Sequence, residues 1–178
     1  MIKRFLYDML DWLRETYWSH DFYLERDVVW TVQKRLQRLI SSEQMPLRVF
    51  NDYPIAPGNR RSLCVDIAIL RDKNVLLAIE FKYEPDHRRG IGNDAEILPS
   101  KFDPSVVLWG KDGVLKDIER CQSYVANGKS EAAVSLFVDE GGCFRHRDPH
   151  SGTSWIDWPN ADGHGEVSIL MGCFGALK

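Results

Sequence analysis

Two apolar runs lie close together in the sequence, Leu63-Cys64-Val65-Asp66-Ile67-Ala68-Ile69-Leu70 and Val75-Leu76-Leu77-Ala78-Ile79-Glu80-Phe81-Lys82. Both runs are rich in the branched residues typical of strands, and Asp72-Lys73-Asn74 between them is typical of a tight hairpin. Side chains alternate between the two faces of a strand, so Glu80 and Lys82 share one face of the second strand. The hairpin places Asp66 of the first strand opposite Glu80.

Two carboxylates that face each other across a sheet repel, so this arrangement makes physical sense when a cation lies between them. A divalent metal ion is the obvious candidate. The alternative is an exposed ion pair between Glu80 and Lys82 at the end of a strand. That alternative leaves Asp66 unexplained, because Asp66 interrupts the middle of an apolar run.

The composition is that of an ordinary globular protein, with 178 residues, 44% hydrophobic and 28% charged. A formal net charge of -3 argues against a protein that coats nucleic acid by bulk attraction. Any contact with nucleic acid must therefore come from local basic groups. The candidates are Arg60 and Arg61, then His87-Arg88-Arg89, and Arg145-His146-Arg147, each of which is alternatively a solvated loop.

The cysteine pattern and the amino-terminal segment both predict a soluble, cytoplasmic protein that does not enter a membrane. The four cysteines form no C-x-x-C pair and are predicted to be reduced core residues: Cys64, Cys121, Cys143 and Cys173. Acids at Asp8 and Asp11 interrupt the amino terminus before a secretory signal could form, and no segment reaches membrane-spanning length.

Helical periodicity predicts a first helix over about residues 2–18. A second helix is predicted to follow Ser19-His20-Asp21, whose side chains would cap it, and to run to about Ile40. The strand at residues 47–50 is expected to end before Pro54. A further helix is predicted from Asp112, its capping residue, to Asn127-Gly128, and a strand over residues 132–138. Residues 84–111 lack periodicity and are predicted to form a long loop beside the acids.

These elements predict a single domain over residues 1–178, with a core at about 22–138, an N-terminal helix at 2–18 and a C-terminal extension at 141–178. The extension is expected to add an edge strand at 167–171, and its Trp155 and Trp158 either stack bases or close a core. A crossover helix on one sheet face and the early helices on the other give an α/β/α sandwich with a central mixed sheet.

This order of elements and acids resembles the PD-(D/E)XK nuclease superfamily, which has the restriction-endonuclease-like fold, over about residues 22–138. Asp66 matches the first motif acid, Glu80 the second and Lys82 the motif lysine. Glu25 matches the acid often found on the first core helix, although the helix dipole alone also favours an acid there. The proline of the family's name is replaced by Val65, a common departure.

The resemblance implies a Mg²⁺-dependent, or Mn²⁺-dependent, nuclease that hydrolyses DNA. Asp66, Glu80 and the backbone carbonyl of Phe81 would hold the ion, and Glu25 would bind it directly, bind it through water or orient a second ion. Lys82 would position the attacking water or help to deprotonate it, with a pKa open to lowering by burial and by the metal.

Several further expectations follow from the resemblance. Gln122 and Tyr124 lie on the following helix, where some branches of the superfamily carry functional polar groups. The residues expected to bind substrate are Arg60, Arg61, Arg88, Arg89 and Gln122. RNA stays open as a substrate because the phosphate chemistry of the two polymers is shared, and a homodimer is one implied assembly. The competing hypothesis is a catalytically inactive module of the same fold that binds nucleic acid or a protein partner.

Overall fold

The structure is a computed structural model that describes residues 1–58, 62–88, 108–158 and 165–177. The helices are α1 (Ile2–Thr16), a short 3-10 helix (Tyr17–Ser19), α2 (Glu25–Ser42) and α4 (Val114–Ala126). The strands are β1 (Arg48–Ala56), β2 (Leu63–Arg71), β3 (Asn74–Glu84), β4 (Ala132–Glu140), β5 (Thr153–Trp158) and β6 (Val167–Gly175).

The strands form one six-stranded mixed sheet in the order β1-β2-β3-β4-β6-β5. β1, β2 and β3 form the predicted antiparallel meander, and β4 pairs parallel to β3. Parallel neighbours need a crossover connection, and α4 lies in the segment that joins β3 to β4. The predicted central mixed sheet with a crossover helix is therefore confirmed.

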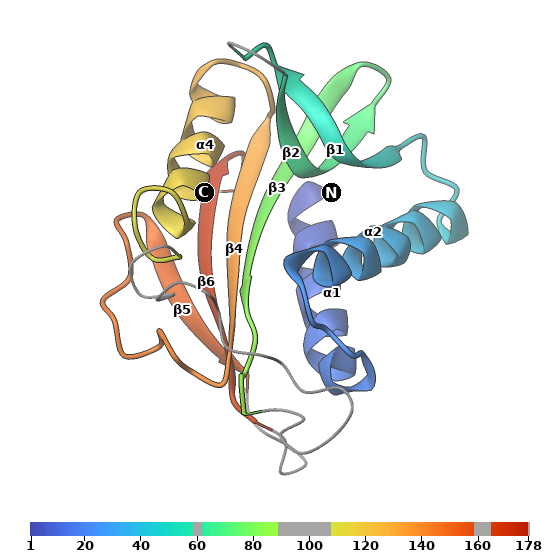
Figure 1. Cartoon of the computed structure of the whole chain (residues 1–178). Helices are drawn as coiled ribbons and strands as arrows, with labels where there is room; N and C mark the ends of the chain where they lie inside the picture. The colour runs from blue at the N-terminus through green and yellow to red at the C-terminus, as the bar shows by residue number, and fades with distance from the viewer. Residues whose placement is uncertain (59–61, 89–107, 159–164, 178) are drawn as a thin grey trace.

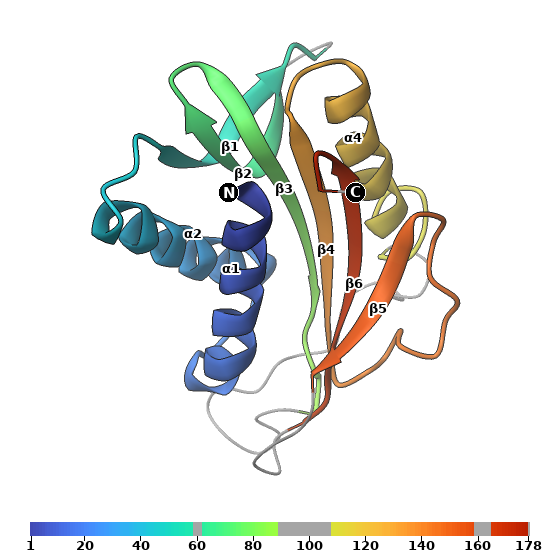
Figure 2. The same ribbon diagram turned by 180° about the vertical axis from the view of Figure 1, so that it is seen from behind.

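Helices cover both faces of the sheet, with α1 and α2 on one side and α4 on the other (Figures 1 and 2). Alternation along the strands divides the core accordingly. Ile67, Ile79 and Phe81 pack with α1 and α2, whereas Ala68 and Ala78 pack with α4. The even-numbered face around residue 80 of β3 thus looks toward α4, and this orientation positions the candidate site.

The first two helices form as predicted, but a different side chain caps the second. Six apolar residues that recur at helical spacing in this segment are buried: Phe5, Leu6, Met9, Leu10, Leu13 and Tyr17. The expectation that Ser19-His20-Asp21 caps the second helix is wrong, because α2 begins only at Glu25. Asp27, inside the first turn, accepts hydrogen bonds from the backbone nitrogens of Tyr23 and Leu24.

The strand expected to end before Pro54 instead runs through it to Ala56. Within the described residues β1 is an edge strand that pairs only with β2, so a proline can be accommodated where a backbone donor is not needed. Asp112 does not cap α4 either; Gly113 occupies the cap position and no side chain bonds there. The helix ends as predicted at Asn127, and Gly128 follows with φ of 63°.

The C-terminal segment is an integral part of the sheet. Residues 167–171 were expected at an edge, but β6 lies between β4 and β5, and β5 forms the edge. Trp158 is buried, and the Trp155 ring lies parallel to the Trp109 ring with centroids 6.0 Å apart. These contacts favour the core-closing alternative for both tryptophans.

Of the four cysteines, all of which are free thiols, only Cys121 is buried. Cys64 and Cys173 are half-buried and Cys143 is exposed, so the expectation of four core residues is wrong for Cys143. In the described part of the chain, no helix combines the length and apolar character needed to span a membrane.

Candidate active site

Asp66 and Glu80 lie where the β2–β3 ladder ends. Paired residues run from Arg71 and Asn74 at the hairpin to Ile67 and Ile79, and the next step of this register brings Asp66 and Glu80 together. Asp66 Oδ2 accepts a hydrogen bond of 2.7 Å from the backbone nitrogen of Phe81, the residue that follows Glu80. The structure thus brings the two predicted acids together on neighbouring strands.

Glu80 is buried, with 1% of the residue exposed, and is held by α4. The hydroxyl of Tyr124 donates a 2.5 Å hydrogen bond to Glu80 Oε1, and the Arg120 guanidinium lies 3.7 Å from the same oxygen. Burial, followed by the charge of Asp66, raises the pKa of Glu80 to about 8 despite these two partners. In the protein alone, Glu80 therefore tends to keep its proton at neutral pH.

Lys82 forms the centre of a second set of contacts two residues along the same face of β3. Its Nζ lies 3.1 Å from Glu25 Oε2, 3.0 Å from Asp117 Oδ2 and 3.0 Å from the backbone oxygen of Phe81. Burial alone would lower the pKa of Lys82, but the charges of Asp117 and Glu25 outweigh it and raise the pKa. The expected depression of this pKa is therefore wrong for the protein alone, and Lys82 is held as an ammonium ion.

Asp117 and Arg120, both on α4, are the two residues of this cluster that sequence reasoning missed. Asp117 lies in the first turn of α4 with 1% of the residue exposed, and its Oδ1 is 3.6 Å from Arg120. An available signal was its position, because Asp117 and Tyr124 lie on the same helical stripe as the buried Ile118 and Cys121. A carboxylate on the apolar face of a helix requires a partner, and Lys82 supplies one.

Glu25 comes from the opposite helical layer. It is the first residue of α2, where the N-terminus of the helix favours negative charge. Burial nevertheless raises the pKa of Glu25, and the neighbouring Lys82 lowers it while Asp66 raises it further. The cluster thus joins four carboxylates and two cations from two helices and two strands: Glu25, Asp66, Glu80, Asp117, Lys82 and Arg120.

The donor set fits a hard divalent cation, although the described residues contain no group of three His, Cys, Asp or Glu side chains arranged to hold one. Mg²⁺ needs only one or two carboxylates because it keeps several waters and binds substrate phosphate. Asp66 and Glu80 provide two adjacent carboxylates, and the Phe81 carbonyl provides a third oxygen near Lys82. Positive charge there would oppose the burial and repulsion that keep Glu80 protonated.

Two hollows give access to this cluster. One, of about 410 Å³, is lined by Leu24, Glu25, Arg26, Val29, Trp30, Asn51, Asp52 and Asp66. The other, of about 510 Å³, is lined by Asp52, Gly58, Ser62, Leu63, Cys64 and Arg120. Of the cluster, Glu25 and Asp66 line the first hollow and Arg120 lines the second, while Asp52 of β1 lines both.

The predicted substrate-binding residues are not brought to the cluster where the structure describes them. Arg60, Arg61 and Arg89 lie outside the described residues. Arg88 is exposed and its guanidinium binds both carboxylate oxygens of Asp86, at 2.9 and 3.1 Å. Gln122 is exposed on α4, whereas Asp117 and Tyr124 are buried on the same helix.

The basic loop before β5 makes contacts of its own. Arg145 pairs with Asp157, and the Arg147 guanidinium lies 5.6 Å from the centre of the Trp109 ring.

Comparisons of the chain with models of protein families, with curated proteins and with solved structures give no match.

Proposed function

We propose that this protein is a metal-dependent nuclease of the PD-(D/E)XK type that hydrolyses DNA phosphodiester bonds with Mg²⁺ or Mn²⁺. The observation that carries the proposal is the convergence of Asp66, Glu80 and Lys82 where β2 and β3 separate, with Glu25 beside Lys82. Paired buried carboxylates next to a lysine are suited to metal-assisted attack on a phosphodiester.

The order of the elements supports the same proposal. A helix with Glu25 at its start is followed by an antiparallel meander, a crossover helix and a strand parallel to β3. Asp66 lies on the second strand of the meander, and Glu80 and Lys82 lie on the third. This is the order of elements on which the resemblance to the restriction-endonuclease-like fold rests, and it supports the proposal.

Asp66, Glu80 and the carbonyl of Phe81 would hold the cation, which supplies charge neutralisation at the phosphate and a water of lowered pKa. Lys82, as an ammonium ion, would donate a hydrogen bond to the attacking water or to a phosphoryl oxygen and stabilise the negative charge that develops there. Its raised pKa makes it a poor proton acceptor, which disfavours the role of general base.

The helices would fix the positions of these groups. Glu25 and Asp117 hold the Lys82 ammonium from two sides, and Tyr124 holds Glu80 Oε1. Arg120 lies near both Glu80 and Asp117 and balances part of their charge. These contacts come from α2 and α4, so the packing of both helix layers would control the geometry of the reaction.

A non-catalytic module is the second candidate, and the closed contacts of Lys82 favour it. The ammonium already has three oxygen acceptors within the protein, as expected of an ion pair that only stabilises the fold. The two candidates differ in their response to metal. A nuclease requires Mg²⁺ or Mn²⁺ for turnover, whereas a module of this kind binds without cleaving.

Cleavage of linear, circular and single-stranded DNA, and of RNA, by the wild-type protein in Mg²⁺, in Mn²⁺ and in EDTA separates the candidates. Glu80→Ala and Lys82→Ala are expected to abolish cleavage. The matched controls are Glu119→Ala on α4 and Lys111→Ala, since both residues are exposed. Cleavage that persists in both site variants, or that is equal in EDTA, contradicts the proposal.

A further inference from the structure

An exposed apolar patch lies at the start of α2, next to the candidate active site. Among the described residues five large hydrophobic side chains are exposed, and three of them come from residues 23–30: Tyr23, Leu24 and Trp30. Leu24 is 65% exposed and Trp30 is 46% exposed. A concentration of exposed apolar surface in one short segment is typical of an interaction site.

Part of this patch borders a hollow that Glu25 and Asp66 also line. Trp30 and Leu24 line the hollow of about 410 Å³ together with Glu25 and Asp66. The volume lies within the range of about 300–1,000 Å³ that is common for small-molecule sites. A group bound against Trp30 would therefore lie beside the acids.

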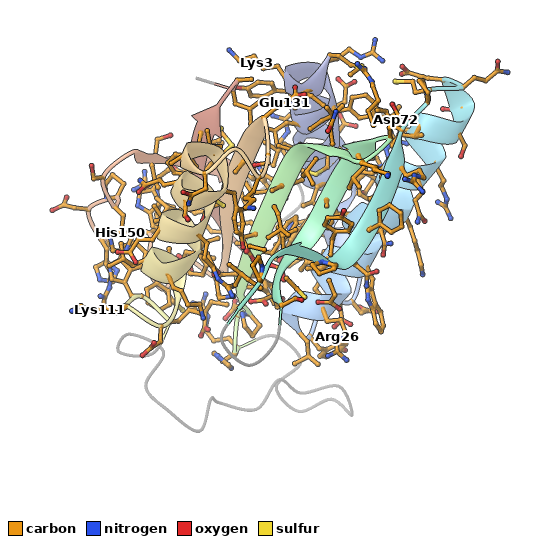
Figure 3. The ribbon with its side chains drawn as sticks, turned by 90° about the horizontal axis from the view of Figure 1, so that it is seen from above. Lys3, Arg26, Asp72, Lys111, Glu131 and His150 are labelled. Atoms are coloured by element: carbon orange, nitrogen blue, oxygen red, sulfur yellow. The ribbon has the colours of Figure 1, made fainter. Side chains whose placement is uncertain are left out.

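The charges around the hollow select what part of a ligand can enter it. Three carboxylates, Glu25, Asp52 and Asp66, line the hollow and repel a phosphate that has no metal ion beside it. Arg26 provides a cation, and its guanidinium carbon lies 5.7 Å from the centre of the Trp30 ring. Figure 3 shows Arg26 at the start of α2, far from the turn at Asp72. A ligand that stacks an uncharged aromatic ring on Trp30 and places a phosphate near Arg26 would avoid the three carboxylates and still contact the cation.

We propose that Trp30 is a base-stacking residue and that the preferred substrate carries an unpaired nucleotide beside the scissile phosphate. This inference rests on the proposed nuclease function. Bases within a duplex are already stacked on their neighbours, so only an unpaired or displaced base reaches the indole without an energetic cost for unstacking. Stacking on a tryptophan is tolerant of sequence, because every base has an aromatic face.

The test compares a single strand of about 12 nucleotides, which contains a fluorescent adenine analogue, with the blunt duplex of the same sequence. Affinity is measured on the full chain with Ca²⁺, and KM with Mg²⁺, for the wild type, Trp30→Ala, Trp30→Phe and Arg26→Ala. Tyr7→Ala is the matched control, because Tyr7 is 48% exposed on α1 and does not line the hollow.

Trp30→Ala is expected to raise the Kd and the KM for the single strand by about 5- to 150-fold and to abolish quenching of the analogue. Trp30→Phe keeps a ring, so its affinity should stay within about threefold of the wild type, and Arg26→Ala should weaken binding of the single strand and lessen its salt dependence. The Kd of Trp30→Ala for the blunt duplex should equal that of the wild type. Tyr7→Ala should bind both the single strand and the duplex as the wild type does.

Two outcomes overturn the inference while the nuclease proposal stands. In one, the wild type cleaves DNA and Trp30→Ala binds the single strand as the wild type does. In the other, the substitution weakens single-strand and duplex binding equally, so that Trp30 contacts the strand without reading an unpaired base. A wild-type protein that neither binds nor cleaves any of these nucleic acids refutes both proposals.

Discussion

Glu80→Gln is expected to make the metal-free protein more stable at neutral and alkaline pH. Glu80 is buried, and burial together with the charge of Asp66 raises its pKa from 4.5 to about 8. Between these values the unfolded chain releases the proton while the folded protein keeps it, so the free energy of unfolding falls as the pH rises. Glutamine has no proton to lose in this range, and its amide oxygen can still accept the hydrogen bond from Tyr124.

The size of the effect follows from the shift. The interval from 4.5 to about 8 is about 3.5 pKa units, and each unit corresponds to about 1.36 kcal/mol, which gives an upper limit of about 5 kcal/mol. The titration of Glu80 is shared with Asp66, so we expect about 2 kcal/mol of relative stabilisation. In a protein of this size, 2 kcal/mol corresponds to about 4–8 °C in Tm.

The assay is thermal unfolding in EDTA at about pH 5 and about pH 8, which lie near the two ends of the interval between the unfolded and folded pKa values of Glu80. Other buried acids, including Asp139 with a pKa raised by burial to about 6, also make stability fall with pH. The quantity to compare is therefore the Tm difference between Glu80→Gln and the wild type at each pH, with Glu119→Gln on α4 as the exposed control.

The Tm difference should grow by several degrees from the lower to the higher pH, and Mg²⁺ should raise the Tm of the wild type more than that of the variant. A difference that is the same at both pH values means that Glu80 does not titrate in this range. A wild-type Tm that Mg²⁺ does not raise at about pH 8 would show that the acids bind no cation.

The other predictions concern the groups around the two acids and the core beneath them. Asp117→Asn should lower the rate of cleavage by about 10- to 100-fold, because Lys82 loses a contact that positions it. The basic limb of the pH–rate profile should also move to lower pH, because loss of the Asp117 charge lowers the pKa of Lys82. Tyr124→Phe should weaken Mg²⁺ affinity by about tenfold or more in calorimetric titration, since the residue that orients Glu80 is lost; an unchanged affinity contradicts that role. Ile79→Ala, in the core against α1 and α2, should cost about 2–5 kcal/mol of stability in urea unfolding.

The positions of Asp66, Glu80 and Lys82 could be predicted because they depend on local rules. A strand has a side-chain period of two, and the short turn at Asp72 fixes the register of the hairpin, so the spacing between residues 66 and 80 brings the two acids together. The helix that carries Asp117 was also predicted, with nearly the same boundaries. Its placement above Lys82 depends on how α4 packs on the sheet, which periodicity does not specify.

The wrong expectation for the pKa of Lys82 has the same origin. From the sequence, burial was the visible influence, and burial lowers the pKa of a lysine. The partners that reverse the sign, Glu25 and Asp117, belong to helices on opposite faces of the sheet and are 57 and 35 positions away along the chain. Strand order beyond β4 was missed for a similar reason, because β6 pairs with two strands through contacts between distant residues.

The interior position of β6 has a consequence for biosynthesis. All other strands emerge from the ribosome before residues 167–175, so the nascent chain can form the meander and β4 while one edge of β4 still lacks its neighbour. An uncovered strand edge invites pairing with other chains. A chain that ends ahead of Val167 would contain every proposed catalytic group, yet its uncovered β4 edge would promote aggregation. Inactivity of such a fragment would therefore report on self-association and not on the chemistry of the acids.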